Sequence, residues 1–280
     1  MSRTLYVTDM DGTLLGPDSQ VSERSRSIIS DLSRQGALIT VATARTPATV
    51  QPLLAGMHTT LPAITMTGAA LWRRNPPGFE QLHLMSATDV ATCLRLCAAC
   101  GIHPFVYTLG QEGADLQVYH AGDSLNHAEQ NFYDERRNLR LKHFHLRRPL
   151  PEAALERTIL LCTLGPLRHI NEAAEALGRH TQCVVQSYPD ILMADTGILE
   201  VFAPGVSKAA AVEDMRRTAG ADRVVVFGDN LNDLPMMEVA DVAVAVANAL
   251  PEVREAADVV IGRNADDAVA RFILDDFLAS

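Results

Sequence analysis

Short apolar segments that end on carboxylates limit the possible folds of this chain more than any other feature. The segment Leu5-Tyr6-Val7 has the β-branched and aromatic character of a buried strand, and Asp9, Asp11 and Gly12 follow it. An unpaired carboxylate is expensive to remove from water, so two of them in such a turn usually meet a cation or a proton. Open α/β sheets bind their ligands at the carboxyl ends of strands, where this pair would lie. A capped turn after a strand is the alternative interpretation.

Strand and helix patterns alternate in both the N-terminal and the C-terminal parts of the chain. The N-terminal part predicts a helix over residues 22–35, a strand over 37–42, a helix beginning at Thr46-Pro47 and a strand over 62–66. Parallel strands joined by helices form right-handed crossovers. The predicted fold class is therefore α/β, with a doubly wound, mostly parallel, Rossmann-like core sheet.

The middle of the chain has a different pattern. Strand signals outnumber helix signals there and follow one another at hairpin spacing, which favours a mostly antiparallel sheet. Pro204-Gly205 marks the return to alternating strands and helices. We therefore expect residues 1–82 and 204–280 to form a Rossmann-like catalytic core, and residues 83–203 to form an inserted α+β cap that sets substrate specificity.

A second apolar strand followed by carboxylates is predicted near the other end of the chain. Residues 224–227 are uniformly apolar, and Gly228, Asp229 and Asp233 follow them. Because Asp229 also comes at the carboxyl end of a strand, it is suited to complete a metal shell begun by Asp9. Mg²⁺ is the expected ion, since it prefers carboxylate oxygens. An Asn/Asp-rich turn is the alternative.

Other polar residues near these strand ends suit a phosphate group. Thr43 precedes a helix start, where free N–H groups favour anions, although a simple N-cap is the alternative. Lys208 is expected in the first turn of a helix capped by Ser207. The helix dipole opposes a cation there, so Lys208 either has an anionic partner or is an ordinary exposed lysine. Asn232 could donate to a phosphate oxygen, and Asp233 could hold Lys208 or a metal-bound water.

The spacing of the first two aspartates suits phosphoryl transfer. Asp9 can attack phosphorus and become an aspartyl phosphate. Asp11 can protonate the leaving oxygen and then accept a proton from the hydrolytic water. A divalent ion would offset the repulsion between these carboxylates and the phosphate.

Four motifs together resemble those of the haloacid dehalogenase-like (HAD) phosphatases. They are Asp-Met-Asp-Gly-Thr-Leu-Leu at residues 9–15, Thr43 after the second strand, Lys208 in Gly-Val-Ser-Lys, and Gly-Asp-Asn-Leu-Asn-Asp at residues 228–233. Their order and the large insertion resemble the Cof-type subfamily (IIB), which has an α/β cap. The chain departs from the family pattern at Ala44, where Gly is frequent, and at Thr67, where many relatives have Asn.

The resemblance implies a role for each matching residue. Asp9 would be the nucleophile and a Mg²⁺ ligand, and Asp11 the general acid/base with its backbone carbonyl on the metal. Asp229 would be the remaining metal ligand, and Asp233 would lie just outside the ligands. The phosphoryl oxygens would be held by Met10, Thr43, Ala44, Lys208 and Asn232.

The sequence thus predicts a Mg²⁺-dependent phosphoric monoester hydrolase that acts on a small phosphorylated metabolite, with a sugar phosphate as the expected class. A phosphomutase of the same superfamily, or a non-catalytic protein that binds a phosphorylated metabolite, would share these motifs. The net charge of −10 argues against nucleic acid as a partner, and no apolar run reaches the roughly 20 residues of a membrane span. Five cysteines and a start that runs straight into a strand, without a signal peptide, favour the cytoplasm. A monomer or a homodimer is expected.

Two further clusters are interpreted as structural. Cys93, Cys97 and Cys100 have the C-x₃-C-x₂-C spacing of some iron–sulfur enzymes, but they also share one face of a predicted helix, which favours core packing. A basic cluster over residues 140–148 could bind substrate anions, although a solvated strand face is favoured. Its members are Arg140, Lys142, His143, His145, Arg147 and Arg148.

Overall fold

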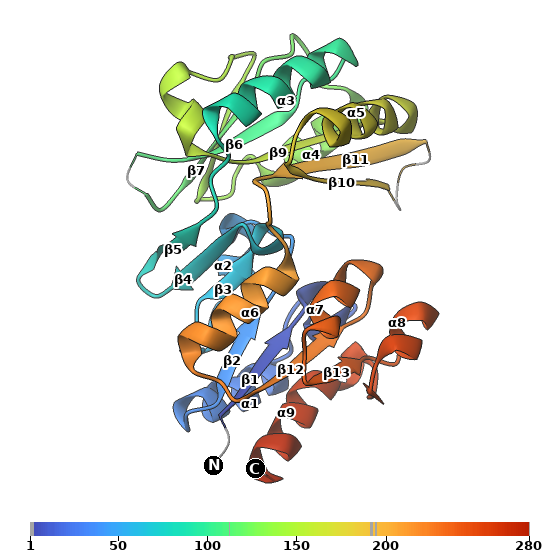
Figure 1. Cartoon of the computed structure of the whole chain (residues 1–280). Coiled ribbons are helices and arrows are strands. Elements are labelled where there is room, and N and C mark those ends of the chain that lie inside the picture. Colours follow the sequence, from blue (N-terminus) through green and yellow to red (C-terminus); the bar gives the residue numbers. More distant parts are fainter. Residues whose placement is uncertain (1–2, 112, 191–192, 194, 280) are drawn as a thin grey trace. The chain divides into compact units, whose positions relative to one another are not determined.

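The computed structural model describes residues 3–111, 113–190, 193 and 195–279. The chain forms two compact units (Figure 1). The core unit comprises Met1–Glu80 and Ser207–Ser280, and the inserted unit comprises Gln81–Val206. None of the helices within the described ranges is long and apolar enough to cross a membrane.

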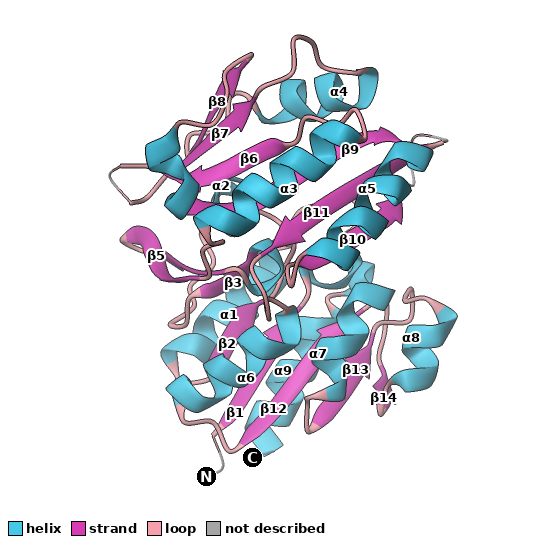
Figure 2. Ribbon diagram, turned by 45° about the horizontal axis from the view of Figure 1, so that its top comes forward, coloured by secondary structure: helices cyan, strands magenta, loops and turns pink. Residues whose placement is uncertain are grey.

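A parallel sheet forms the centre of the core unit (Figure 2), as predicted. Its strands stand in the order β14-β13-β12-β1-β2, each parallel to its neighbour. The strands are β1 (Thr4–Thr8), β2 (Leu38–Val41), β12 (Arg223–Gly228), β13 (Val242–Ala245) and β14 (Val259–Val260). A parallel bridge between Ala42 and Ile64 adds β3 (Ala63–Thr65) beside β2. β3 pairs antiparallel with β4 (Ala70–Arg74), and β5 (Pro77–Leu82) is the third strand of this small sheet.

The strand order identifies the functional edge of this sheet. From β1 the chain moves outward through β2 to β3, and from β12 it moves in the opposite direction through β13 to β14. The order therefore reverses between β1 and β12. In doubly wound sheets, ligands bind at the carboxyl ends of the strands at such a reversal.

The helices of the core unit begin where the sequence places capping residues. Ser22 accepts a hydrogen bond from the Ser25 amide at 2.9 Å, and Ser207 accepts one from the Ala210 amide at 3.0 Å. In the sheet's two helix layers, α1 packs against α9, and α6 packs against α7. The helices are α1 (Glu23–Arg34), α2 (Pro47–Leu53), α6 (Lys208–Ala219), α7 (Leu234–Glu238), α8 (Pro251–Ala256) and α9 (Ala268–Ala279).

The inserted unit contains a six-stranded sheet in the order β10-β11-β9-β6-β7-β8. All neighbouring strands are antiparallel except β7 and β8, in agreement with the predicted, mostly antiparallel α+β module. The strands are β6 (Phe105–Leu109), β7 (Leu116–His120), β8 (Lys142–Leu146), β9 (Thr158–Pro166), β10 (Val184–Pro189) and β11 (Thr196–Phe202). The helices are α3 (Ala87–Ala99), α4 (His127–Arg136) and α5 (Leu167–His180).

The exposure of the side chains tests the predictions for the cysteine cluster and for the basic cluster, both of which were interpreted as structural. Cys93 and Cys97 are buried on α3 and are free thiols, which confirms core packing for both. In the basic cluster, Arg140, His143, Arg147 and Arg148 are exposed as predicted, whereas Lys142 is only 2% exposed and contradicts the prediction. Its Nζ lies 5.0 Å from the ring centroid of Tyr107, and this burial lowers the pKa of Lys142 to about 7. Side chains alternate along a strand, so one member of a basic run can point inward while the next faces solvent.

Candidate active site

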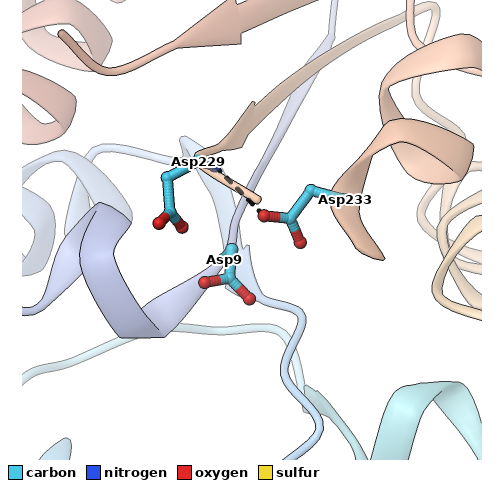
Figure 3. Close-up of side chains that lie close together, drawn as sticks. All are labelled: Asp9, Asp229 and Asp233. Atoms are coloured by element: carbon cyan, nitrogen blue, oxygen red, sulfur yellow. Dashed lines mark hydrogen bonds between the residues drawn. The ribbon is translucent and has the colours of Figure 1, made fainter. Parts of the chain in front are cut away.

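Two adjacent strands bring distant aspartates together at the reversal point. Asp9 directly follows β1 and Asp229 directly follows β12, and the Asp9 amide donates to the Phe227 carbonyl at 2.9 Å. Asp233 adds a third carboxylate from the turn before α7 (Figure 3). Each of the three aspartates offers an oxygen, and these atoms lie within 4.8 Å of one another. This donor set is made of oxygen alone, which suits a hard divalent cation such as Mg²⁺.

Lys208 lies between two of these carboxylates. Its Nζ donates to Oδ1 of Asp9 at 2.6 Å and to Oδ1 of Asp233 at 2.8 Å, and its side chain is 3% exposed. The anionic partner expected for a lysine at a helix start is therefore present. The other oxygen of Asp233 accepts from the amides of Asp229 and Asn230, at 3.1 and 3.2 Å. Asp233 thus fixes both Lys208 and the loop that carries Asp229.

Burial dominates the electrostatics of this cluster. Desolvation raises the pKa of Asp9 to about 7, and the nearby Lys208 only partly opposes that rise. Desolvation also raises the pKa of Asp229 to about 6, against the lowering effect of the Thr13 hydroxyl. Burial by itself would lower the pKa of Lys208, but Asp9 and Asp233 outweigh it and raise that pKa. One ammonium among three carboxylates leaves the cluster with excess negative charge, which a divalent cation would neutralise.

The Asp229 carboxylate is held in place by the turn that follows β1. Thr13 donates its hydroxyl hydrogen to Oδ1 of Asp229 at 2.8 Å. A Cβ atom on Gly12 would lie 2.3 Å from Oδ2 of the same carboxylate, so only glycine leaves room for it. The Asn248 side chain donates to the Gly12 carbonyl at 2.8 Å and secures this turn from the far side. Thr13 and Asn248 were not among the predicted site residues, although Thr13 lies inside the motif at residues 9–15.

Asp11 has a different environment from Asp9. Its side chain is 53% exposed, and both carboxylate oxygens accept from Arg45, at 2.7 Å from Nε and 2.6 Å from Nη2. The hydrogen bond to Asp11 raises the pKa of Arg45. The Asp11 carboxylate is therefore oriented by an arginine outside the metal-binding cluster. Arg45 is a site residue that sequence reasoning missed.

The remaining predicted phosphate-binding residues differ in exposure. Thr43 follows β2 and is 1% exposed, and its hydroxyl oxygen accepts from the Arg45 amide at 3.1 Å. Ala44 is half-buried, and Asn232 is exposed. The Met10 side chain is fully buried, so only its backbone could reach a ligand. The phosphate-binding roles of these residues stay predictions.

Gly68 has a packing role next to the Thr67 departure from the family pattern. A Cβ atom on Gly68 would lie 2.2 Å from the carbonyl oxygen of Ser207, the cap of α6. Glycine therefore allows the start of α6 to approach the segment after β3. Because Lys208 is the first residue of α6, this close approach helps to position its ammonium group.

Comparison with known families decides the classification. A family model described as haloacid dehalogenase-like hydrolase matches residues 6–273. The chain belongs to this family. The predicted family and the predicted enzyme class, a phosphoric monoester hydrolase, are thereby confirmed.

Curated relatives match this HAD-like hydrolase along nearly its whole length. The 5-amino-6-(5-phospho-D-ribitylamino)uracil phosphatase YcsE of Bacillus subtilis is 26% identical over 275 residues, covering 96% of this chain and 94% of that protein. The pyridoxal phosphate phosphatase YbhA of Escherichia coli is 25% identical over 283 residues, covering 98% of each.

Solved structures show the same fold. TM0651 from Thermotoga maritima gives a TM-score of 0.76 at 24% identity, covering 99% of this chain and 97% of that one. The HAD subclass IIB sugar phosphatase BT4131 gives a TM-score of 0.70 at 18% identity, covering 98% of this chain and 99% of that one.

Proposed function

We propose that this HAD-like hydrolase is a Mg²⁺-dependent phosphatase that cleaves a small phosphomonoester through an aspartyl phosphate on Asp9. The observation that carries the proposal is the environment of Asp9. This buried carboxylate accepts from Lys208 and lies within metal-ligand distance of Asp229, at the strand reversal. Relatives along the whole chain are named as phosphatases, which supports the same reaction class.

The reaction has two displacement steps. An oxygen of Asp9 attacks phosphorus while the bond to the leaving oxygen breaks, and Asp11 gives that oxygen its proton. Water then attacks the same phosphorus and releases Asp9, and the proton of the water passes to Asp11. Arg45 pairs with both oxygens of Asp11 in the structure, so this pair must open for Asp11 to take up the proton that it donates. Lys208, Thr43 and the Ala44 amide would hold the phosphoryl oxygens.

The cation would be held by Asp9, Asp229 and the backbone carbonyl of Asp11. When bound, Mg²⁺ neutralises the carboxylates and phosphate oxygens that would otherwise repel one another. Asp233 also lies close enough to be a ligand, but both of its oxygens already accept hydrogen bonds from Lys208 and from backbone amides. We therefore assign Asp233 to orienting Lys208.

The substrate is proposed to be a sugar phosphate or a similar small metabolite. The names of the relatives include phosphatases of a phosphoribityl uracil and of pyridoxal phosphate, and one neighbour in fold is named a sugar phosphatase. The choice among such leaving groups is assigned to residues 83–203. A cytoplasmic location, where the five free cysteines would stay reduced, and a monomeric or dimeric state are also proposed.

A phosphate-release screen over many metabolites tests the proposal. Turnover should require Mg²⁺, need no bisphosphate activator and disappear in Asp9→Asn, whereas Asp275→Asn on the exposed face of α9 should keep full turnover. Acid-quenched enzyme should gain one phosphoryl group on the peptide that contains Asp9. Turnover that depends on a bisphosphate would identify a phosphomutase, and binding without turnover would identify a metabolite-binding protein. Either result would reject the proposal.

A further inference from the structure

The inserted unit contains a polar cavity of about 360 Å³ that the proposed reaction does not use. Its walls come from the loops around residues 101–103 and 122–126, from α4, and from the junction of β9 with α5. All of these segments belong to residues 81–206, so the cavity lies within one unit. Its volume is within the range of sites that bind small ligands or hydrated ions.

His120 is the most unusual group in this cavity. It is the last residue of β7 and is only 2% exposed. Neither Nδ1 nor Nε2 has a hydrogen-bond partner, although buried polar atoms are nearly always paired. The ring packs against Phe105, with 4.9 Å between the ring centroids. An imidazole held in this way offers a free nitrogen lone pair to the cavity.

A buried carboxylate lies beside His120. Oε1 of Glu129 is 3.8 Å from Nε2 of His120, which is too long for a hydrogen bond. Two ligands of one zinc ion, each about 2.0–2.2 Å from the metal, can be separated by this distance. The carboxylate is fixed by the Asn126 amide at 3.0 Å and by the Thr163 hydroxyl at 3.2 Å. His120 and Glu129 are therefore two rigid groups with room for an ion between them.

The rest of the lining favours a cation with an affinity for nitrogen. His103 and His169 also line the cavity, and neither lysine nor arginine is among its described lining residues, which argues against a phosphate. Gly122 keeps the space open between two imidazoles: a Cβ there would lie 2.8 Å from Cε1 of His120 and 3.2 Å from Cδ2 of His103. Imidazole with carboxylate is the donor set of zinc and related transition metals, whereas Mg²⁺ prefers oxygen alone.

We propose that this cavity is a second metal site, which binds Zn²⁺ through Nε2 of His120 and Oε1 of Glu129. The exposed His103 ring turns inward as the third protein ligand, and water completes the coordination. The site differs in chemistry from the all-oxygen cluster at Asp9 and Asp229. A bound ion would join β7 to α4 and so stabilise the inserted unit, because a ligand that binds only the folded state shifts unfolding.

Zinc titration of the full chain tests this site. In the Asp229→Asn background with excess Mg²⁺, one Zn²⁺ should still bind and raise the melting temperature. His120→Gln, Glu129→Gln and His103→Gln should each weaken Zn²⁺ binding by at least about 10-fold, the lower bound seen when even outer partners of a metal are removed. His180→Gln, an exposed change at the end of α5, should leave binding unchanged.

The coordinating atoms are checked with Co²⁺, whose visible absorption spectrum should show nitrogen ligation that is lost in His120→Gln. His103 is exposed, so His103→Gln should fold even where the buried variants do not. The proposal is overturned if Zn²⁺ binding disappears with Asp229→Asn alone. It is equally overturned if His103→Gln binds Zn²⁺ as tightly as the parent. A crystal structure determined with excess Zn²⁺ that shows only an ordered water between His120 and Glu129 would also overturn it.

Discussion

Replacing Gly12 by alanine should damage metal binding without unfolding the protein. Gly12 has φ +77°, and an added Cβ would lie 2.3 Å from Oδ2 of Asp229 and 2.8 Å from its Cγ. Ordinary contact begins at 3.4 Å, so the carboxylate must move by about 1 Å. Such a move breaks its alignment with Thr13, which now donates at 2.8 Å. The variant therefore changes the position of one metal ligand and leaves its chemistry intact.

Gly56 provides a matched control for the cost of placing alanine at a positive φ. It also has φ +77°, but a Cβ there meets its nearest neighbour, Cδ of Arg26, at an ordinary 3.5 Å. Both alanine variants should lose about 1–2 kcal/mol of unfolding free energy, the cost of a left-handed backbone for a residue with a Cβ. Only Gly12→Ala should lose activity, by about 100-fold, since a misplacement of 1 Å at an active site can have an effect of that size.

Phosphate release against Mg²⁺ concentration, together with urea unfolding, measures both effects. We expect a higher Mg²⁺ concentration at half-saturation and a lower maximum rate for Gly12→Ala, and parental values for Gly56→Ala. Full activity in Gly12→Ala would show that the Asp229 position does not matter for the reaction. Equal activity losses in both variants would show that backbone strain, and not the carboxylate, is responsible.

Three further predictions concern charge. Lys208→Met leaves two carboxylates without their buried cation, so urea unfolding should show a loss of about 3–5 kcal/mol, and an unchanged midpoint would contradict the ion-pair network. Lys142→Met should raise stability by about 3–4 kcal/mol at pH 7, because the pKa of Lys142 falls from 10.5 to about 7 on folding. Between these pH values the unfolded chain binds more protons at Lys142, so the stability advantage of the variant should shrink from pH 7 to pH 10; parallel curves would refute this. The affinity for Mg²⁺, measured by calorimetry, should fall as pH drops from 8 to 5.5. Protons compete with the metal for Asp9 and Asp229, because the pKa values of these carboxyl groups are about 7 and 6. An affinity that does not change with pH would show that the metal binds elsewhere.

The position of the candidate site could be predicted because strand ends are visible in a sequence. An apolar run that stops at Asp9 or Asp229 predicts a strand and also the residue at which its carboxyl end lies. Parallel pairing then brings residues more than 200 positions apart to one edge of the sheet. The unfavourable place of Lys208 at a helix start likewise predicted an anionic partner, and the structure supplies two.

Contacts that depend on side-chain direction could not be predicted. Nothing in the sequence shows that Arg45 turns back to hold both oxygens of Asp11, because such pairing follows from rotamers and loop geometry. Lys142 was misjudged for a related reason, since the face of a strand that points inward depends on register. The cavity at His120 combines side chains from strands, helices and loops, so no periodic pattern marks it.

The raised pKa of Asp9 makes it possible to test whether this residue serves the reaction or stabilises the fold. The pKa of Asp9 rises from 3.8 to about 7 on folding, so the folded chain retains a proton that the unfolded chain releases between those pH values. The contribution of this group to stability therefore declines as pH rises through that window and is least favourable above pH 7. Asp9→Asn removes the buried charge while Lys208 keeps Asp233 as its partner, so the variant should be more stable by up to about 4 kcal/mol at pH 8 and by only about 1 kcal/mol at pH 4.5. A large loss of stability at pH 8 would mean that Asp9 serves the ion pair. If Asp9→Asn is more stable than the parent but has no turnover, then the Asp9 carboxylate destabilises the fold and is needed for the reaction.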